Sequence, residues 1–390
     1  MNTIANELLR RLRRVLGTAR AGIPLHEPLF LGREKEYLCE CVDTGWVSSV
    51  GKFVDRFEAD LAAFTGARRA VALVNGTCAL HLALRLAGVR PGEEVLVPAL
   101  TFVATANAVA HANAVPHFID SESSTLGMDP DELAERLAAV AEMRDNLCFN
   151  RQTGRRIAAI VPTHIFGHPV RLDELLEVAN RYGLPVVEDA AESLGSSYQG
   201  VHTGLWGKIG VLSFNGNKTV TTGGGGALLF QDEQLAAKAK HLSTTAKKPH
   251  RWAFEHDHVG FNYRMPNINA ALGCAQLEQL PLFLERKRAL AAAYAEALAD
   301  LDELRFVLEP PGTRSNYWLC ALMLSPACEG SLADILDTTN AAGLMTRPAW
   351  NLLSTLPMFA DCPKGDLSTA SSLARRLVNI PSGPSLVPAT

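Results

Sequence analysis

The chain has 390 residues, of which 47% are hydrophobic and 20% charged, as is typical of a globular protein of about two domains. Lysine and arginine number 37 against 41 aspartate and glutamate, so the sequence lacks the positive field that nucleic-acid binding requires. Neither a secretory signal nor a stretch of about 18 apolar residues occurs, so we expect no membrane span and a cytoplasmic protein.

The cysteines give no sign of a disulfide framework or a metal clamp. Eight cysteines are dilute in a chain of this length, and no CxxC motif occurs. We therefore expect reduced cysteines that pack as small apolar groups, and no metal site.

The N-terminal segment 1–20 is predicted to form an amphipathic helix. Ile4, Leu8, Leu12 and Val15 share one face of that helix, and several arginines lie elsewhere on it. Two interpretations follow from this pattern. The helix either docks on the protein body or a second subunit, or is a membrane-surface or organelle-targeting helix.

From residue 68 onwards, strand-like and helix-like segments alternate. Strands are expected at 68–74, 93–98, 115–120, 156–162, 184–189, 211–214 and 227–230, and helices at 78–88, 101–113, 130–143 and 170–183. This alternation predicts an α/β fold, in which a mostly parallel sheet lies between helices. In such sheets the functional residues lie at the carboxyl ends of the strands.

After residue 255 the pattern changes. A long helix rich in alanine and leucine is expected over 266–301, with a break at Pro281, and shorter strands such as 316–324 follow. We therefore expect a large α/β domain over 1–255, which includes the N-terminal helix, and a smaller C-terminal α+β domain over 256–390.

The first candidate site lies where strand 68–74 turns directly into a helix, at Asn75-Gly76-Thr77-Cys78. Free amides at a helix N-terminus bind phosphate, and glycine permits close approach. The turn lacks both GxxxxGK[ST] and GxGxxG, so a phosphate bound here would belong neither to ATP nor to NAD. The alternative is an ordinary turn of a parallel-sheet protein.

Three further segments carry polar residues next to apolar runs. Asp189 ends a strand that is apolar on both faces, where it would either pair with a cation, such as a protonated ring nitrogen, or cap the next helix. Lys218 lies between a short apolar strand and a glycine turn, where partial removal from water would favour a nucleophilic neutral amine; a salt bridge is the alternative. Asn262 and Arg264 precede the long helix, where loop capping would explain them equally well.

Together these segments resemble the DegT/DnrJ/StrS family of sugar aminotransferases, which use pyridoxal phosphate (PLP) on the fold type I scaffold. The resemblance runs from residue 23 to the end of the chain. It is carried, in order, by NGTCALHLAL, PALTFVATANA, EDAAESLGSSYQG, SFNGNKTVTTGGGGA and GFNYRMPNINAALG. The segment TGWVSSVGKFVDRFE (44–58) also resembles the branch that aminates 4-keto-6-deoxy nucleotide sugars.

The resemblance implies a role for each matching position. Lys218 would hold PLP as a Schiff base, and Asp189 would pair with the ring nitrogen of the cofactor. Glu192 would lie near the phenolic oxygen of PLP, and Phe102 would stack on its ring. The active sites would be shared within a homodimer, and the phosphate would be held by Gly76, Thr77, Cys78, Ser213 and, from the neighbouring subunit, Asn262.

Three more residues are candidates for substrate binding. Arg347 and Trp350 would contact the phosphate or carboxylate of the acceptor, with a structural salt bridge as the alternative for Arg347. His164 ends a strand that should point at the site, and we expect it to support the site through hydrogen bonds rather than take part in catalysis.

The resemblance also implies an activity. The enzyme would move an amino group from L-glutamate to a keto sugar by a ping-pong mechanism, with a nucleotide-linked 4-keto-6-deoxy hexose as acceptor and surface polysaccharide as the destination. Lys218 stands where the dehydratases of the family carry histidine, which favours transamination. The alternatives are a nucleotide-free keto sugar acid of the keto-octulosonate type as acceptor, a non-catalytic sugar-binding or regulatory protein, and a sugar dehydratase or epimerase.

Overall fold

The computed structural model describes residues 3–17 and 22–386, and its centre is a mixed sheet. Hydrogen-bonded pairing gives the strand orders β1-β11-β10-β7 and β3-β2-β6, and parallel bridges Ile160–Val186 and Thr163–Asp189 join the two groups. Every pairing in this sheet is parallel except those of β11. The strands are β1 (Arg69–Leu73), β11 (Gly226–Phe230), β10 (Ile209–Ser213), β7 (Val187–Asp189), β6 (Ile157–Ile160), β2 (Glu94–Pro98) and β3 (Val115–Ile119).

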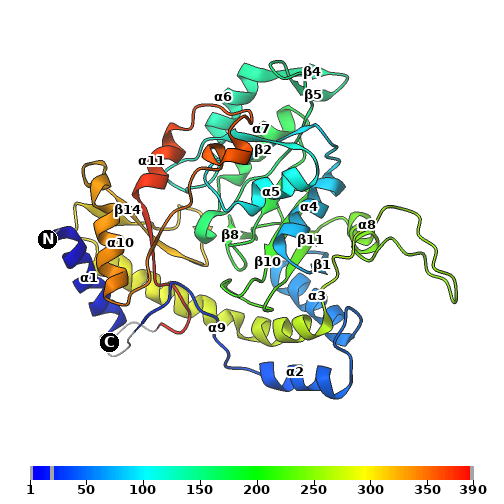
Figure 1. The fold of residues 1–390 in the computed structure, drawn as a ribbon, viewed down its shortest axis with the longest axis horizontal. Helices are drawn as coiled ribbons and strands as arrows, with labels where there is room; N and C mark the ends of the chain where they lie inside the picture. Colours follow the sequence, from blue (N-terminus) through cyan, green and yellow to red (C-terminus); the bar gives the residue numbers. More distant parts are fainter. Residues whose placement is uncertain (1–2, 18–21, 387–390) are drawn as a thin grey trace.

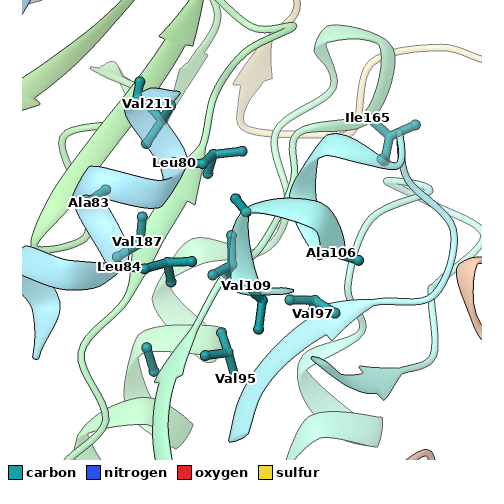
Figure 2. Close-up of a cluster of buried hydrophobic side chains, with 14 of the residues drawn as sticks. Leu80, Ala83, Leu84, Val95, Val97, Ala106, Val109, Ile165, Val187 and Val211 are labelled. Atoms are coloured by element: carbon teal, nitrogen blue, oxygen red, sulfur yellow. The ribbon is translucent and has the colours of Figure 1, made fainter. Parts of the chain in front are cut away.

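Helices cover both faces of the sheet, which explains why its strands read as continuous apolar runs. Val71 of β1 points to the face covered by α4 (Gly76–Ala87), α5 (Ala104–His111) and α8 (Glu233–Ser243), whereas its neighbours Ala70 and Ala72 point to the face covered by α3 (Lys52–Thr65) and α9 (Asn267–Ala297). Figure 2 shows the first of these packed layers, where Leu80 and Leu84 of α4 lie beside Val187 and Val211 of the sheet. Helices α6 (Pro130–Val140) and α7 (Leu172–Arg181) cover the β2-β3-β6 part.

A second, smaller sheet lies in the C-terminal part of the chain. Its strands are antiparallel, in the order β12-β14-β16-β15. They are β12 (Leu304–Phe306), β14 (Cys320–Leu324), β16 (Leu377–Ile380) and β15 (Arg347–Pro348), accompanied by α10 (Leu332–Ala341) and α11 (Ser368–Arg376). The mixed α+β character expected after residue 255 is present, and the division into two domains at that point stays a prediction.

Helix α9 runs through the expected break at Pro281 without interruption. The predicted break was wrong. The proline ring is exposed to solvent, and the helix is buried against other parts of the protein both before and after Pro281. Ala270 and Cys274 are buried against α3 and the large sheet, and Leu290 and Tyr294 are buried against the small sheet. The lost backbone hydrogen bond is therefore offset by packing at both ends.

The N-terminal helix is α1 (Thr3–Leu16), and the remaining residues of the expected segment, apart from Gly17, lie outside the described ranges. Helix α1 lies beside α9 and α10 (Figure 1). Leu8 and Leu12 are fully buried, and they pack in one cluster with Tyr294 of α9 and Ile335 of α10. Its apolar face is thus used for docking on the C-terminal part, as the first of our two interpretations expects. No helix in the described ranges has both the length and the apolar character needed to cross a membrane.

The helix expected over 130–143 ends early. Asp129 caps it as expected, accepting a hydrogen bond from the Asp131 amide at 2.9 Å. The chain then turns into a hairpin of β4 (Ala141–Arg144) and β5 (Leu147–Asn150), joined by Asp145 and Asn146, both with positive φ. Such a two-residue turn selects a hairpin and overrides the helical pattern before it.

Shorter elements complete the fold. They are α2 (Glu34–Asp43), β8 (Ser197–Tyr198), β9 (Val201–His202) and β13 (Thr313–Arg314), together with 3-10 turns at Ile165–Gly167, Pro326–Ser331, Leu353–Thr355 and Pro357–Phe359. The eight cysteines are free thiols, as expected.

Candidate active site

A cavity of about 310 Å³ lies at the carboxyl ends of the central strands. It is where the sequence analysis expects a site, because neighbouring parallel strands end there. The predicted residues that line it are Gly76, Thr77, Phe102, Asp189, Glu192, Ser213, Lys218 and Trp350. The fold therefore brings together side chains that are up to 274 positions apart in the chain.

One end of the cavity is the N-terminus of helix α4. The side chain of Asn75 caps this helix and accepts a hydrogen bond from the Cys78 amide at 2.7 Å. The first-turn amides of Gly76 and Thr77 have no intrahelical partner and remain available for an anion. A Cβ at Gly76 would lie 3.0 Å from the Cβ of Ser213, so glycine is needed for this close approach.

The floor of the cavity holds the carboxylate of Asp189, which is 4% exposed. One of its oxygens accepts a hydrogen bond from the Thr105 hydroxyl at 2.8 Å, and the other accepts one from the Ala191 amide at 3.2 Å. Burial raises the pKa of Asp189, and these donors together with Lys218 only partly oppose that shift. The side chain has no ion-pair partner within 4.0 Å among the described residues, so it is suited to receive a cation from a ligand.

The cavity lining includes the amine of Lys218, whose Nζ lies 3.5 Å from Oε1 of Glu192. The other carboxylate oxygen of Glu192 accepts a hydrogen bond from the Phe166 amide at 2.8 Å. Burial raises the pKa of Glu192 to about 7, against the opposing effect of Lys218. Glu192 can therefore hold or release a proton near neutral pH, next to the amine.

The sequence analysis missed several residues of this site. Trp318, on the loop before β14, places its ring 3.8 Å from Nζ of Lys218 and donates its indole N–H to the Asn217 carbonyl. Thr163, three positions after the end of β6, lies in the cavity wall, and its hydroxyl finds no hydrogen-bond partner in the described part of the chain. Thr105 lies in the quoted PALTFVATANA motif, but only the fold shows that its hydroxyl faces Asp189.

Two further aromatic residues, Phe102 and Trp350, belong to the cavity lining. Phe102 is 52% exposed, and its ring centroid lies 6.4 Å from that of Trp350. Trp350 in turn lies against Phe166, with ring centroids 5.1 Å apart. These aromatic rings give a flat ligand an apolar surface to pack against.

Four predicted residues lie outside the cavity lining. Cys78 commits its amide to Asn75, and Asn262 is exposed and accepts a hydrogen bond from Arg264 at 3.0 Å. Arg347 is exposed and donates to Asn340, and it has no salt bridge, its alternative role, to any residue that the structure describes. The roles of these residues stay predictions.

His164 is the fourth of them. It is fully buried, with Nε2 3.1 Å from Oε2 of Glu188 and Nδ1 accepting from the Val170 amide. Its own amide donates to the carbonyl of Asp189. It thus contacts the strand end that carries Asp189, and the supporting role that the sequence analysis expects for it stays a prediction.

Comparison with known proteins identifies a family and similar proteins for this chain. A family model described as the DegT/DnrJ/EryC1/StrS aminotransferase family matches residues 31–390. GDP-perosamine synthase of Escherichia coli O157:H7 is 36% identical over 369 residues, which are 93% of this chain and 94% of that protein. The spore coat polysaccharide biosynthesis protein SpsC of Bacillus subtilis (strain 168) is 35% identical over 291 residues, 72% of this chain and 70% of that protein.

The fold has a solved counterpart as well. The crystal structure of the aminotransferase TlmJ from Streptoalloteichus hindustanus matches with a TM-score of 0.84 at 29% identity, covering 94% of each chain. The predicted type I fold of PLP-dependent aminotransferases and the predicted enzyme class, a sugar aminotransferase, are thereby confirmed. The chain belongs to the DegT/DnrJ/EryC1/StrS aminotransferase family.

Proposed function

We propose that this enzyme uses pyridoxal phosphate to move an amino group from L-glutamate to a nucleotide-linked 4-keto-6-deoxy hexose that enters a surface polysaccharide. Two similarities support the acceptor and its destination: one relative is named for a GDP-linked product, and another for polysaccharide biosynthesis. A mass-spectrometric screen of keto sugars, nucleotide-linked and nucleotide-free, tests this choice. A glutamate-dependent gain of an amino group only on a nucleotide-free keto sugar acid would contradict it.

The residues of the cavity fit the cofactor. Asp189 is a buried carboxylate without an ion-pair partner among the described residues, and a protonated pyridine nitrogen would supply the missing positive charge. The free amides at the start of α4 suit a phosphate group. The amine of Lys218 lies in the same cavity and can bond to an aldehyde. The buried carboxylate of Asp189, which has no ion-pair partner among the described residues, is the main support for PLP as the cofactor.

When bound, PLP supplies an electron sink that stabilises negative charge on the amino carbon of the donor. The protein side chains supply proton transfer and shield the site from water. The amine of Lys218 moves a proton at that carbon, as a positioned base and acid worth about 10²–10⁴ in rate. Asp189 keeps the ring nitrogen protonated, and the neighbouring Glu192 exchanges protons near pH 7. The buried ring of Trp318 shields the amine from water, and Phe102 would offer an aromatic face to the ring of the cofactor.

Because one amine serves both half-reactions in turn, we predict ping-pong kinetics. Initial rates measured against glutamate at several fixed concentrations of the keto sugar should give parallel double-reciprocal lines. Glutamate alone should also release 2-oxoglutarate, in an amount equal to the enzyme. Intersecting lines, or release that requires the sugar, would contradict a shared amine.

We further propose that the active site is shared between two copies of the chain, with Asn262 reaching the phosphate of the neighbouring site. Its exposed position, outside the cavity of its own chain, supports this assignment. Lys218→Ala and Asn262→Ala homodimers should each be weakly active. Mixing them by unfolding and refolding should restore about a quarter of the wild-type activity, since half of the dimers are hybrids with one intact site of two.

The matched control is a mixture of Lys218→Ala with Asp189→Ala. Both side chains belong to the same chain's cavity, so hybrids of these two should recover no activity. A monomer by light scattering at assay concentration would refute the shared site, as would a lack of recovery in mixtures with Asn262→Ala.

A further inference from the structure

A second group of chemically active side chains lies away from the cavity, where the segment 244–262 folds back on the end of helix α8. This segment projects from the body of the molecule (Figure 1). Nε2 of His241, in the last turn of α8, lies 2.7 Å from Oδ1 of Asp257. Nδ1 of His258 lies 2.9 Å from the same oxygen. All three atoms lie within 4.8 Å of one another.

Backbone contacts hold these side chains in place independently of their charges. Thr244 pairs with Asn262 and Lys247 pairs with His256 in isolated antiparallel bridges. The amide of Ala246 donates to the carbonyl of His241 at 2.9 Å. The two imidazole rings face the carboxylate from different directions, with ring planes at 89°. The three groups therefore converge on one point, which lies between a helix end and a hairpin-like loop.

Histidine is also unusually concentrated here. The chain has 11 histidines, and four of them, His241, His250, His256 and His258, fall in this short stretch. Two of the four point at the carboxylate of Asp257. A purely structural ion pair would need only one of them.

Two imidazole nitrogens and a carboxylate oxygen are ligands typical of zinc and other first-row transition metals. Calcium and magnesium favour oxygen ligands throughout. The side chains of His241 and Asp257 are 30% and 32% exposed, and that of His258 is 60% exposed, so a metal ion can enter from solvent. Three protein ligands leave one position for water, as in open four-coordinate zinc sites.

We propose that His241, Asp257 and His258 bind one divalent transition-metal ion, which fastens the segment 244–262 to helix α8. To bind the metal, Nε2 of His241 and Nδ1 of His258 must each present a lone pair. The proton that each nitrogen now shares with the carboxylate then moves to the other nitrogen of the same ring or to solvent. The Asp257 carboxyl, whose pKa the histidine hydrogen bonds keep well below its usual range, is already ionised for the metal. This site departs from our expectation of a chain without metal, because Asp257 and the histidines come together only through the turn after α8.

The test is a calorimetric titration of the full chain with ZnCl₂ in metal-free buffer. Wild-type protein should bind one zinc ion at this site, and Zn²⁺ should raise its melting temperature. His241→Gln and His258→Gln should each weaken this binding at least tenfold, since even the loss of a partner behind a ligand costs about 10–100-fold. His250→Gln, in the same segment but outside the cluster, should bind like the wild type.

Free thiols are the competing ligands, and cobalt separates them from the proposed site. Co²⁺ bound by two imidazoles and a carboxylate gives visible bands without thiolate charge-transfer absorption, and these bands should disappear in His258→Gln. Equal zinc affinity in wild type and both cluster variants would overturn the proposal. Thiolate absorption that persists in the variants, or the absence of any binding by wild type, would overturn it as well.

Discussion

Replacing Lys218 by alanine should remove amino transfer from glutamate almost completely while the fold remains intact. The variant loses the only amine among the residues that line the cavity, and with it a proton-transfer group worth about 10²–10⁴ in rate. The measurement is release of 2-oxoglutarate from glutamate by cofactor-loaded protein, with circular dichroism as the test of folding. Lys208→Ala, which changes an exposed lysine ten positions earlier, should keep full activity.

A second lysine makes this test stringent. Lys287 is fully buried, and burial lowers its pKa to about 7, so a large share of its side chain is a neutral amine near pH 7. Its Nζ, however, donates to the carbonyls of Trp318 and Ser382 and does not line the cavity. Borohydride reduction of the loaded enzyme followed by peptide mapping should label Lys218. Labelling of Lys287 instead, or normal turnover by Lys218→Ala, would refute the assignment.

Replacing Asp189 by asparagine should lower kcat/KM by roughly 10²–10⁴-fold, because removing one partner of a buried ion pair costs about 3–5 kcal/mol. Thr105→Val provides a graded comparison. It removes the 2.8 Å hydrogen bond that orients the carboxylate, together with a longer contact of 3.4 Å to the Thr101 hydroxyl, and should cost about 1 kcal/mol, or roughly fivefold. Equal losses in the two variants would mean that Asp189 acts through packing rather than through its charge.

Although Asp189→Asn should lower activity, it should raise the stability of the cofactor-free protein. Burial raises the pKa of Asp189 in the folded state, so folding favours its protonated form. This contribution to stability is lost as pH rises through the folded-state pKa. At neutral pH, cofactor-free Asp189→Asn should therefore resist urea better than cofactor-free wild type. A loss of both activity and urea resistance would contradict the view that this carboxylate is strained without a ligand cation.

The sequence predicts the large sheet well because its signals are local. Each strand of that sheet is buried on both faces, so it reads as an apolar run that ends near a polar residue, as at Asp189. The order of the strands, and the reversed direction of β11, depend on contacts between distant segments that no local pattern records. The hairpin at Asp145 and Asn146 was missed because the helical periodicity before it continues across the true boundary.

Some residues of the candidate site could likewise be identified from local sequence, and others only from the fold. Lys218 and Asp189 could be identified because charged residues beside apolar strands are costly unless they are used, and because their motifs resemble a known family. Trp318 could not, because its ring reaches Lys218 from a loop 100 positions away in the chain. Thr163 and Thr105 are ordinary threonines until the fold places their hydroxyls in the cavity and beside the carboxylate.

Helix α9 also constrains how the molecule can move. One continuous rod is embedded at its start beneath the large sheet and at its end beneath the small one. A hinge within the rod would break backbone hydrogen bonds and expose apolar side chains at both ends. Closure over a substrate must therefore come from the surrounding loops, and the two halves should melt in a single cooperative transition.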